Sequence, residues 1–315
     1  MRIVFAGTPG FSIPCLQALS NADGMEVVGV VSQPDRRSGR GMRLTPSPVK
    51  QAALDAGIDT ITPENLWNDA ESLAWLEAKK ADMLVVVAFG MILPKPWLDA
   101  PAIAPVNVHA SLLPRWRGAA PIERALLAGD TKTGVCIMHM EEGLDTGGVY
   151  ASQRLPITQV ATGPDLWAAL APMGAQLLVD TLPKIAAGSL KMVPQDDAKA
   201  TYAAKLSSDE RIIDWRLSAD AIDRQVRCFS PKPGARARLN GKWLKIIRGT
   251  PLQNGLIRKA GALAHTDSLD VACGKGTLYR VFTVQPEGKK VMPAEAFLRG
   301  NSITPGQCFD VNDAK

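Results

Sequence analysis

The chain has 315 residues, of which 46% are hydrophobic and 21% are charged. This length favours two domains, and the composition is typical of a globular protein and excludes disordered, collagen-like and coiled-coil chains. The longest apolar stretch, residues 83–93, is broken by Gly90 and is too short to cross a bilayer. We expect no signal or transit peptide, and the five dispersed cysteines are typical of free thiols in a reducing compartment. The sequence therefore predicts a soluble, cytoplasmic protein.

Charge is distributed unevenly along the chain. Residues 1–205 carry 18 Lys and Arg against 20 Asp and Glu, a net charge of −2, whereas residues 206–315 carry 18 against 11, a net charge of +7. A basic C-terminal part attracts polyanions such as nucleic acid. A lysine-rich solubilising surface explains the imbalance equally well, so charge alone leaves both interpretations open.

The first half alternates short apolar runs with longer amphipathic segments. Several runs are rich in Val and Ile without polar alternation, which is typical of strands that are covered on both faces. This βαβ rhythm predicts a doubly wound, Rossmann-like α/β domain with a mostly parallel sheet, whose ligands bind beyond the carboxyl ends of the strands. The expected strands are Arg2–Ala6, Glu26–Val31, Met83–Ala88, Pro105–His109 and Gly134–Met140, and the expected helices are Ser12–Ser20, Ser47–Ala56, Ala70–Lys80 and Pro121–Ala128.

The first expected strand is followed by Gly7-Thr8-Pro9-Gly10. This segment lacks the G-x-G-x-x-G pattern of dinucleotide-binding folds. We therefore interpret it as a plain turn between a strand and a helix, and a nucleotide-dependent oxidoreductase is disfavoured.

The character of the sequence changes after about Leu182. We predict a first domain over residues 1–189, a polar linker over residues 190–207 and a second domain over residues 208–315. In the second domain Asn240-Gly241 separates two apolar runs, a strong signal for a β-hairpin. Several short strands separated by glycine turns predict a small closed β-barrel. Its expected strands are Ala235–Leu239, Trp243–Arg248, Gly255–Ile257, Leu269–Ala272 and Leu278–Val284.

One of only three histidines, His109, lies two residues after Asn107 at the end of an expected strand. This spacing places both side chains on one face of the strand, at the expected ligand edge of the sheet. An amide beside an imidazole suits acyl transfer, because Asn107 can stabilise a developing oxyanion and His109 can move a proton. A buried, hydrogen-bonded pair that closes the strand end would have the same spacing.

Asp145 lies in the loop after the next expected strand, Gly134–Met140. In a parallel sheet that loop emerges at the same edge as His109. A carboxylate there can orient the imidazole or assist removal of an amine proton. An Asx turn among the neighbouring glycines is the alternative, and it is the favoured interpretation on the sequence alone.

A loop at residues 34–44 combines four arginines with two glycines. The planar guanidinium group suits phosphate contacts, and glycine leaves the segment free to adapt to a partner. A solvated flexible loop is the alternative, but next to a basic C-terminal domain the pattern favours contact with nucleic acid. The arginines are Arg36, Arg37, Arg40 and Arg43.

Together, these segments resemble the methionyl-tRNA formyltransferase family along nearly the whole chain. The Asn-Val-His-Ala-Ser-Leu-Leu-Pro block at residues 107–114 is shared with the wider formyltetrahydrofolate-dependent formyltransferases, and Leu-Asp-Thr-Gly at residues 144–147 fits the same resemblance. The arginine loop, Arg-Trp-Arg-Gly-Ala-Ala-Pro at residues 115–121 and the basic C-terminal domain narrow the resemblance to the tRNA-directed family. Lys232 departs from the family, which usually has an aromatic residue there.

The resemblance implies transfer of the formyl group of 10-formyltetrahydrofolate to the amino group of methionyl-initiator-tRNA, which yields N-formylmethionyl-tRNA for translation initiation. It implies that Asn107 stabilises the oxyanion, that His109 handles protons and that Asp145 works with them. It further implies that the C-terminal domain is an OB-fold-like barrel that holds the tRNA backbone. We expect a monomer that needs neither a metal nor a membrane. The implied folate-binding residues are Ser111, Leu112, Leu113 and Pro114, and the implied tRNA-binding residues are Arg36, Arg37, Arg40 and Arg43.

Two other functions compete with this interpretation. A formyltransferase that acts on a sugar nucleotide or a purine-precursor amine would keep Asn107, His109 and Asp145 but has little use for the arginine loop. A non-catalytic RNA-binding protein on the same fold would bind tRNA without turnover. The intact set of three polar groups argues against the second alternative.

Overall fold

The computed structural model describes residues 1–38, 41–252, 258–265, 267–301, 303–304 and 307–310. These residues form two compact units, each assembled from several segments of the chain. Unit 1 comprises Met1–Ile122, Lys132–Pro156 and Trp167–Ala204, and unit 2 comprises Glu123–Thr131, Ile157–Leu166 and Lys205–Lys315. No helix in the described part of the chain is both long and apolar enough to span a bilayer.

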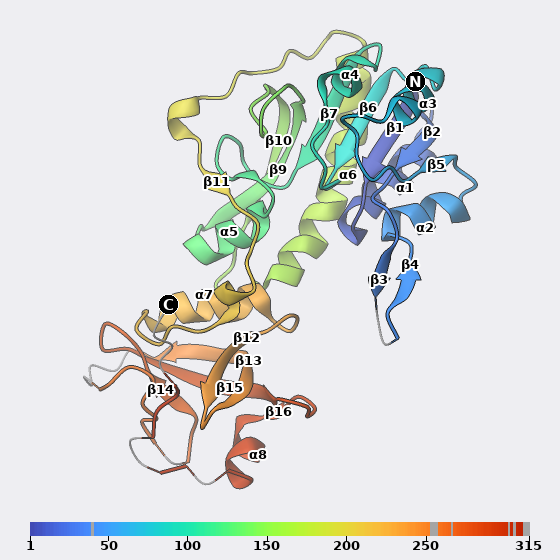
Figure 1. Cartoon of the computed structure of the whole chain (residues 1–315). Helices are drawn as coiled ribbons and strands as arrows, with labels where there is room; N and C mark the ends of the chain where they lie inside the picture. The colour runs from blue at the N-terminus through green and yellow to red at the C-terminus, as the bar shows by residue number, and fades with distance from the viewer. Residues whose placement is uncertain (39–40, 253–257, 266, 302, 305–306, 311–315) are drawn as a thin grey trace. The chain divides into compact units, whose positions relative to one another are not determined.

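Unit 1 is built around a seven-stranded sheet with the order β10-β9-β7-β6-β1-β2-β5 (Figure 1). The five strands from β7 to β5 are parallel, which confirms the predicted mostly parallel sheet. The strands are β1 (Arg2–Gly7), β2 (Glu26–Val31), β5 (Thr60–Ile61), β6 (Met83–Val87), β7 (Ala104–His109), β9 (Lys132–His139) and β10 (Val149–Pro156).

The central strands are buried on both faces. Every residue of β6 is buried, and Ile3, Val4, Phe5 and Ala6 of β1 have no exposed surface. Continuous apolar runs form such strands because helices cover both faces of a doubly wound sheet. The helices of unit 1 are α1 (Ile13–Asn21), α2 (Pro48–Asp55), α3 (Ala70–Ala78), α4 (Lys95–Asp99) and, from Trp167 onward, α6 (Gly163–Ala186). Helix α5 (Pro121–Ala128) belongs to unit 2 from Glu123 onward.

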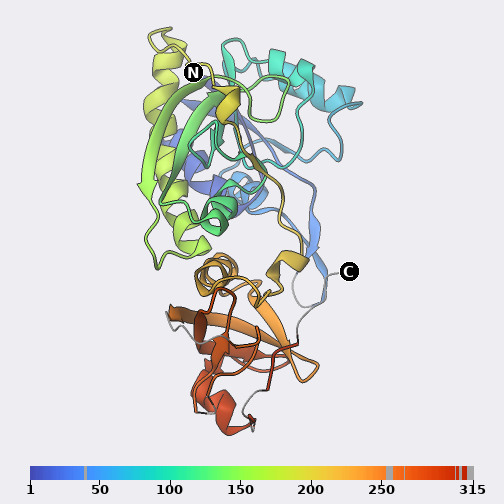
Figure 2. The same cartoon turned by 90° about the vertical axis from the view of Figure 1, so that its left-hand side faces the viewer.

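Helix α6 lies along one face of the sheet (Figure 2). Its Gly174 approaches β7 so closely that a Cβ atom there would lie 2.9 Å from Cγ1 of Val108. This helix is not among those expected from the sequence. Pro172 and Pro183 lie inside it, and proline usually interrupts helices. Since side chains alternate along a strand, the residues on either side of Val108 face away from α6.

Three local features differ from the sequence predictions. Strand β9 is antiparallel to β7, so the expectation that these two strands run in the same direction is wrong. Strand β10, which was not predicted, pairs antiparallel with β9. The arginine-rich segment, expected to be a loop, forms a β-hairpin of β3 (Arg36–Ser38) and β4 (Arg43–Thr45).

The segment expected to be a linker, residues 190–207, is hydrogen-bonded to unit 1 over much of its length. Val193 forms an antiparallel bridge with Val149. Further along, β11 (Tyr202–Ala203) pairs parallel with β8 (Arg117–Gly118). This segment is polar in composition, yet its backbone is paired with strands of unit 1.

Unit 2 contains the C-terminal β domain that the sequence predicts. Its five-stranded sheet has the order β12-β13-β15-β14, with β16 paired to β15. The predicted hairpin joins β12 and β13, and Asn240 and Gly241 have φ values of 52° and 75°, the conformation that Asn-Gly hairpin turns require. The expected strand Gly255–Ile257 lies outside the described residues. The elements are α7 (Ala219–Phe229), β12 (Ala235–Leu239), β13 (Lys242–Leu252), β14 (Asp270–Ala272), β15 (Leu278–Pro286), β16 (Met292–Pro293) and α8 (Ala294–Arg299).

Candidate active site

Asn107 and His109 lie side by side near the carboxyl end of β7. The pleat of the strand directs both side chains to the face opposite Val108, which packs against α6. His109 is buried, with 5% of its surface exposed, and Asn107 is partly buried. The strand thus fixes an amide and an imidazole on one face of the sheet, as their spacing predicts.

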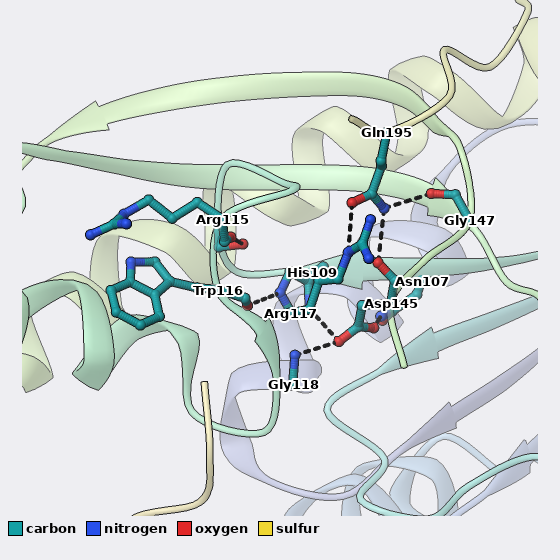
Figure 3. A network of polar contacts seen from close by, with 10 residues as sticks. Asn107, His109, Arg115, Trp116, Arg117, Gly118, Asp145, Gly147 and Gln195 are labelled. Atoms are coloured by element: carbon teal, nitrogen blue, oxygen red, sulfur yellow. Dashed lines mark hydrogen bonds and ion pairs between the residues drawn. The ribbon is translucent and has the colours of Figure 1, made fainter. Parts of the chain in front are cut away.

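Asp145 completes a cluster with these two residues (Figure 3). Its Oδ1 accepts a hydrogen bond from Asn107 Nδ2 at 3.1 Å, and its Oδ2 lies 3.5 Å from His109 Nδ1. The backbone N–H of Gly118 donates to the same Oδ2 at 2.8 Å. Asn107, His109 and Asp145, all singled out from the sequence, are therefore in direct contact.

The path by which the chain brings Asp145 to this cluster differs from the path expected from the sequence. Because β9 is antiparallel to β7, its last residue, His139, lies opposite Val106 rather than beside His109. The chain then reverses, and His139 N–H donates to Gly148 O at 2.9 Å. Gly147 makes this tight return possible, since a Cβ atom there would lie 2.1 Å from His139 O. The return loop, and not a shared strand direction, brings Asp145 to His109.

The imidazole of His109 is held between two oxygen atoms. Its Nε2 lies 2.8 Å from the carbonyl oxygen of Trp116, and its Nδ1 faces the carboxylate of Asp145. A carbonyl oxygen can only accept a hydrogen bond, so Nε2 is the nitrogen that donates to Trp116. The other ring nitrogen, Nδ1, faces Asp145. A proton taken up at Nδ1 therefore lies between the imidazole and the carboxylate.

The predicted folate-binding residues begin two positions after His109 in the chain. Ser111 is fully buried, and its hydroxyl donates to the carbonyl of Arg115 at 2.6 Å. Leu112 packs against β9, where a Cβ atom on Gly134 would lie 2.5 Å from Leu112 Cδ2. Leu113 and Pro114 are partly buried. The loop is therefore anchored beside the cluster by its own hydrogen bond and by an apolar contact.

Three of the four predicted tRNA-binding arginines, Arg36, Arg37 and Arg43, lie on strands β3 and β4. None of the hydrogen bonds described for them reaches Asn107, His109 or Asp145. Arg36 donates to Gln33 Oε1 at 2.6 Å, and Arg37 donates to the carbonyl of Met42 at 3.3 Å. Cross-strand pairing places Arg36 and Arg43 on one face of the hairpin and Arg37 on the other. Arg36, Arg37 and Arg43 are exposed, whereas Arg40 lies outside the described residues.

Two residues of this site were missed from the sequence. Gln195 donates from Nε2 to the carbonyl oxygens of Asp145 and Gly147, at 2.8 and 2.7 Å (Figure 3). Arg117, only 2% exposed, donates from Nε to Gln195 Oε1 at 3.0 Å and from Nη2 to Asp197 at 2.6 Å. The only signal was the polar segment Pro-Gln-Asp-Asp at residues 194–197, which has the composition of a linker.

The other titratable groups near β9 do not supply a nucleophile or a metal site. Cys136 pairs with His109 across the ladder, and burial raises the pKa of its thiol to about 11, which keeps it protonated at neutral pH. Burial also lowers the pKa of His139, whose Nδ1 lies 3.4 Å from the hydroxyl of Tyr150. Within the described ranges, no group of three or more His, Cys, Asp and Glu side chains is arranged to hold a metal ion.

Comparison with known proteins agrees with this geometry. A family model described as "Formyl transferase" matches residues 1–182, and one described as "Formyl transferase, C-terminal domain" matches residues 205–302. The chain is 45% identical over 313 residues to the methionyl-tRNA formyltransferase of Dechloromonas aromatica, with 99% of each chain covered. It is 46% identical over 308 residues to that of Neisseria gonorrhoeae, covering 97% of this chain and 99% of that one.

Solved structures share the fold at lower sequence identity. An N-formyltransferase from Helicobacter canadensis, in complex with folinic acid and dTDP-3-aminofucose, has a TM-score of 0.65 at 18% identity, covering 90% of this chain and 98% of that one. A methionyl-tRNA formyltransferase from Clostridium thermocellum has a TM-score of 0.55 at 16% identity, covering 82% and 96%. The two family models and the full-length relatives show that the chain belongs to the formyltransferase family, in the branch of the methionyl-tRNA formyltransferases.

Proposed function

We propose that the protein transfers the formyl group of 10-formyltetrahydrofolate to the amino group of methionyl-initiator-tRNA, producing N-formylmethionyl-tRNA for translation initiation. One observation carries this proposal: an amide, an imidazole and a carboxylate converge at the end of β7 in a chain that is 45% identical, over nearly its full length, to a methionyl-tRNA formyltransferase. The protein would act in the cytoplasm, where initiator tRNA is charged. We propose a monomer as the active form, as expected from the sequence.

The cluster supports direct acyl transfer. The methionyl amine attacks the formyl carbon, and the carbonyl oxygen becomes an oxyanion in a tetrahedral intermediate. Asn107 Nδ2 carries two N–H groups, one of which binds Asp145, so the other is available to stabilise the oxyanion. Asp145 receives the proton that the amine loses and shares it with His109 Nδ1. The bond between the formyl carbon and N10 of the folate then breaks, and N10 takes up the proton held between Asp145 and His109, which restores the cluster.

The loop of Ser111, Leu112, Leu113 and Pro114 is the proposed folate-binding segment. It begins two residues after His109 at the end of β7, which supports binding of the formyl donor next to the cluster. The Helicobacter canadensis enzyme, which has the same fold, is seen with folinic acid, a formylated tetrahydrofolate. The proposed reaction uses the folate as a co-substrate and requires no metal.

The proposed tRNA contacts lie on the β3–β4 hairpin and on the basic C-terminal domain, residues 208–315. In this proposal residues 1–189 form the catalytic domain and residues 190–207 form the linker. The C-terminal sheet offers cations next to aromatic rings, which suits an RNA partner. The guanidinium carbons of Arg236 and Arg238 lie 4.1 and 4.4 Å from the ring centroid of Trp243. Arg40, which lies outside the described residues, is included in this proposal on sequence grounds.

The proposal is tested by measuring formyl transfer from 10-formyltetrahydrofolate to initiator methionyl-tRNA. Elongator methionyl-tRNA, free methionine and an amino-sugar nucleotide serve as alternative acceptors. We expect rapid formylation of the initiator tRNA alone. Formylation of the sugar nucleotide in preference to both tRNAs would contradict the proposal and assign the cluster to a small-molecule amine.

The hairpin makes a separate prediction about salt dependence. In the variant Arg36→Ala/Arg43→Ala, which removes two exposed cations from one face of the hairpin, tRNA should bind more weakly. The slope of log Kd against log salt should fall by about 1 for each lost phosphate contact. Filter binding between about 50 and 200 mM salt measures this slope.

The matched control for the hairpin variant is Arg154→Ala/Lys184→Ala, which removes two exposed cations elsewhere. This control lowers the net charge by the same amount, so it separates a local contact from general charge. Equal slopes for the two double variants would remove the hairpin from the tRNA interface.

A further inference from the structure

We infer that Gln195 is a positioning residue for the reaction proposed above. It fixes the backbone around Asp145 so that the carboxylate faces Asn107 and His109. Residues 193–203, which we call the connecting segment, are thereby an integral part of the active site and not a passive link to the second domain. The catalytic role of Gln195 rests on the proposed function, whereas its role in holding the Asp145 backbone rests on hydrogen bonds alone.

Every hydrogen-bonding group that Gln195 uses here is matched to a fixed partner. The two carbonyl oxygens of Asp145 and Gly147 can only accept, so they face the amide nitrogen, which has two protons to donate. The guanidinium of Arg117 can only donate, so it faces the amide oxygen. The orientation of the amide is therefore determined by its surroundings, and no other residue type of this size offers two donors and one acceptor in this arrangement.

The loop that Gln195 holds needs external support. Asp145 has a φ of 54°, in the left-handed region, which aspartate adopts more readily than most residues other than glycine but which is still less favourable than a negative φ. Gly143, Gly147 and Gly148 surround it, and glycine adds conformational freedom. The two hydrogen bonds from Gln195 flank Thr146 and hold the backbone on both sides of it.

The connecting segment also supports the other side of the cluster. Thr201 Oγ1 accepts from the backbone N–H of Trp116 at 2.9 Å, and the carbonyl of Trp116 in turn holds His109 Nε2. Strand β11 pairs with β8, whose Gly118 N–H binds the Asp145 carboxylate. One segment of about ten residues thus orients both the imidazole and the carboxylate, each through a single intermediate residue.

The test compares Gln195→Glu with the wild type. Glutamate has nearly the same size and keeps an acceptor for Arg117, but it places a carboxylate against two carbonyl oxygens that need donors. We expect kcat for formyl transfer to fall on the order of 10²-fold, as for a misplacement of a reacting group by about 1 Å. KM for the folate and for tRNA should stay within about twofold, because substrate-binding groups remain in place. The matched control is Gln176→Ala, an exposed glutamine on α6, which should leave kcat unchanged.

A double-mutant cycle with Asp145→Ala separates positioning from general structural damage. If Gln195 acts through Asp145, Gln195→Glu should cost less than about twofold in the Asp145→Ala background. Additive losses would overturn the inference, and so would a Gln195→Glu enzyme with wild-type kcat.

Hydrogen exchange provides a readout that does not depend on activity. The Gly118 amide donates to Asp145 Oδ2, so displacement of the carboxylate should speed its exchange by about tenfold or more in Gln195→Glu. Unchanged exchange at Gly118 would overturn the inference. If the wild-type chain fails to formylate tRNA, the proposed function fails, and the exchange rate still decides whether Gln195 positions Asp145.

Discussion

Replacing Asn107 by Ala is expected to lower kcat for formyl transfer by about 10²- to 10³-fold, as for the loss of an oxyanion-hole donor. The side chain donates to Asp145 with one N–H and has a second N–H for the oxyanion, and alanine removes both. The effect should fall on kcat more than on KM, because the oxyanion exists only in the transition state and the intermediate. Single-turnover formylation with saturating folate measures the rate of the chemical step.

The control for this variant is Asn68→Ala, which changes an exposed asparagine outside the helices and strands of unit 1. Circular dichroism and thermal unfolding of both variants show whether the fold is retained. A folded Asn107→Ala enzyme with near-normal turnover would contradict the assignment of Asn107 to the oxyanion.

The variant His109→Ala should lose about 10²- to 10⁴-fold in kcat, the usual contribution of a positioned proton-transfer group. The ring lies between Asp145 and the carbonyl of Trp116, so alanine leaves the carboxylate without the group that shares its proton. It also opens a cavity at a buried position, so the stability of the variant is measured together with its rate.

His139 offers a matched control, since it lies on the neighbouring strand β9 and is not in contact with Asp145 in any described hydrogen bond. The variant His139→Gln should keep the wild-type rate and pH profile. If His139→Gln and His109→Ala lose activity equally, the imidazole of His109 has no special part in the reaction.

The features that the sequence predicts well are determined by a few neighbouring residues. The positions of Asn107 and His109 follow from the alternation of side chains along one strand. The turn at Asn240-Gly241 follows from two residues that readily adopt positive φ. Both features could be predicted because no distant part of the chain is needed to form them.

Features that depend on distant contacts could not be predicted in the same way. Nothing in the residues of β9 shows whether this strand runs parallel or antiparallel to β7. The direction of β9 decides at which edge of the sheet the loop that follows it begins. Asp145 does lie beside His109, as expected from the sequence, but a return loop and not a parallel strand brings it there. Gln195 lies 50 residues further along the chain from the carbonyl of Asp145 that it binds, so only the fold reveals the contact.

The assembly of unit 2 from three segments has a consequence for genetic exchange between relatives. Glu123–Thr131 and Ile157–Leu166 interrupt the sequence of unit 1 yet bind residues of the C-terminal part: Arg124 pairs with Glu210, and Arg227 donates to the carbonyl of Ala161 at 2.6 Å. A chimera joined at residue 204 would take the C-terminal residues of these contacts from one parent and the residues of the two inserted segments from the other. Functional hybrids should therefore need the two inserted segments to be exchanged together with the C-terminal part, so recombination at a single junction is a poor route to new acceptor specificity in this chain.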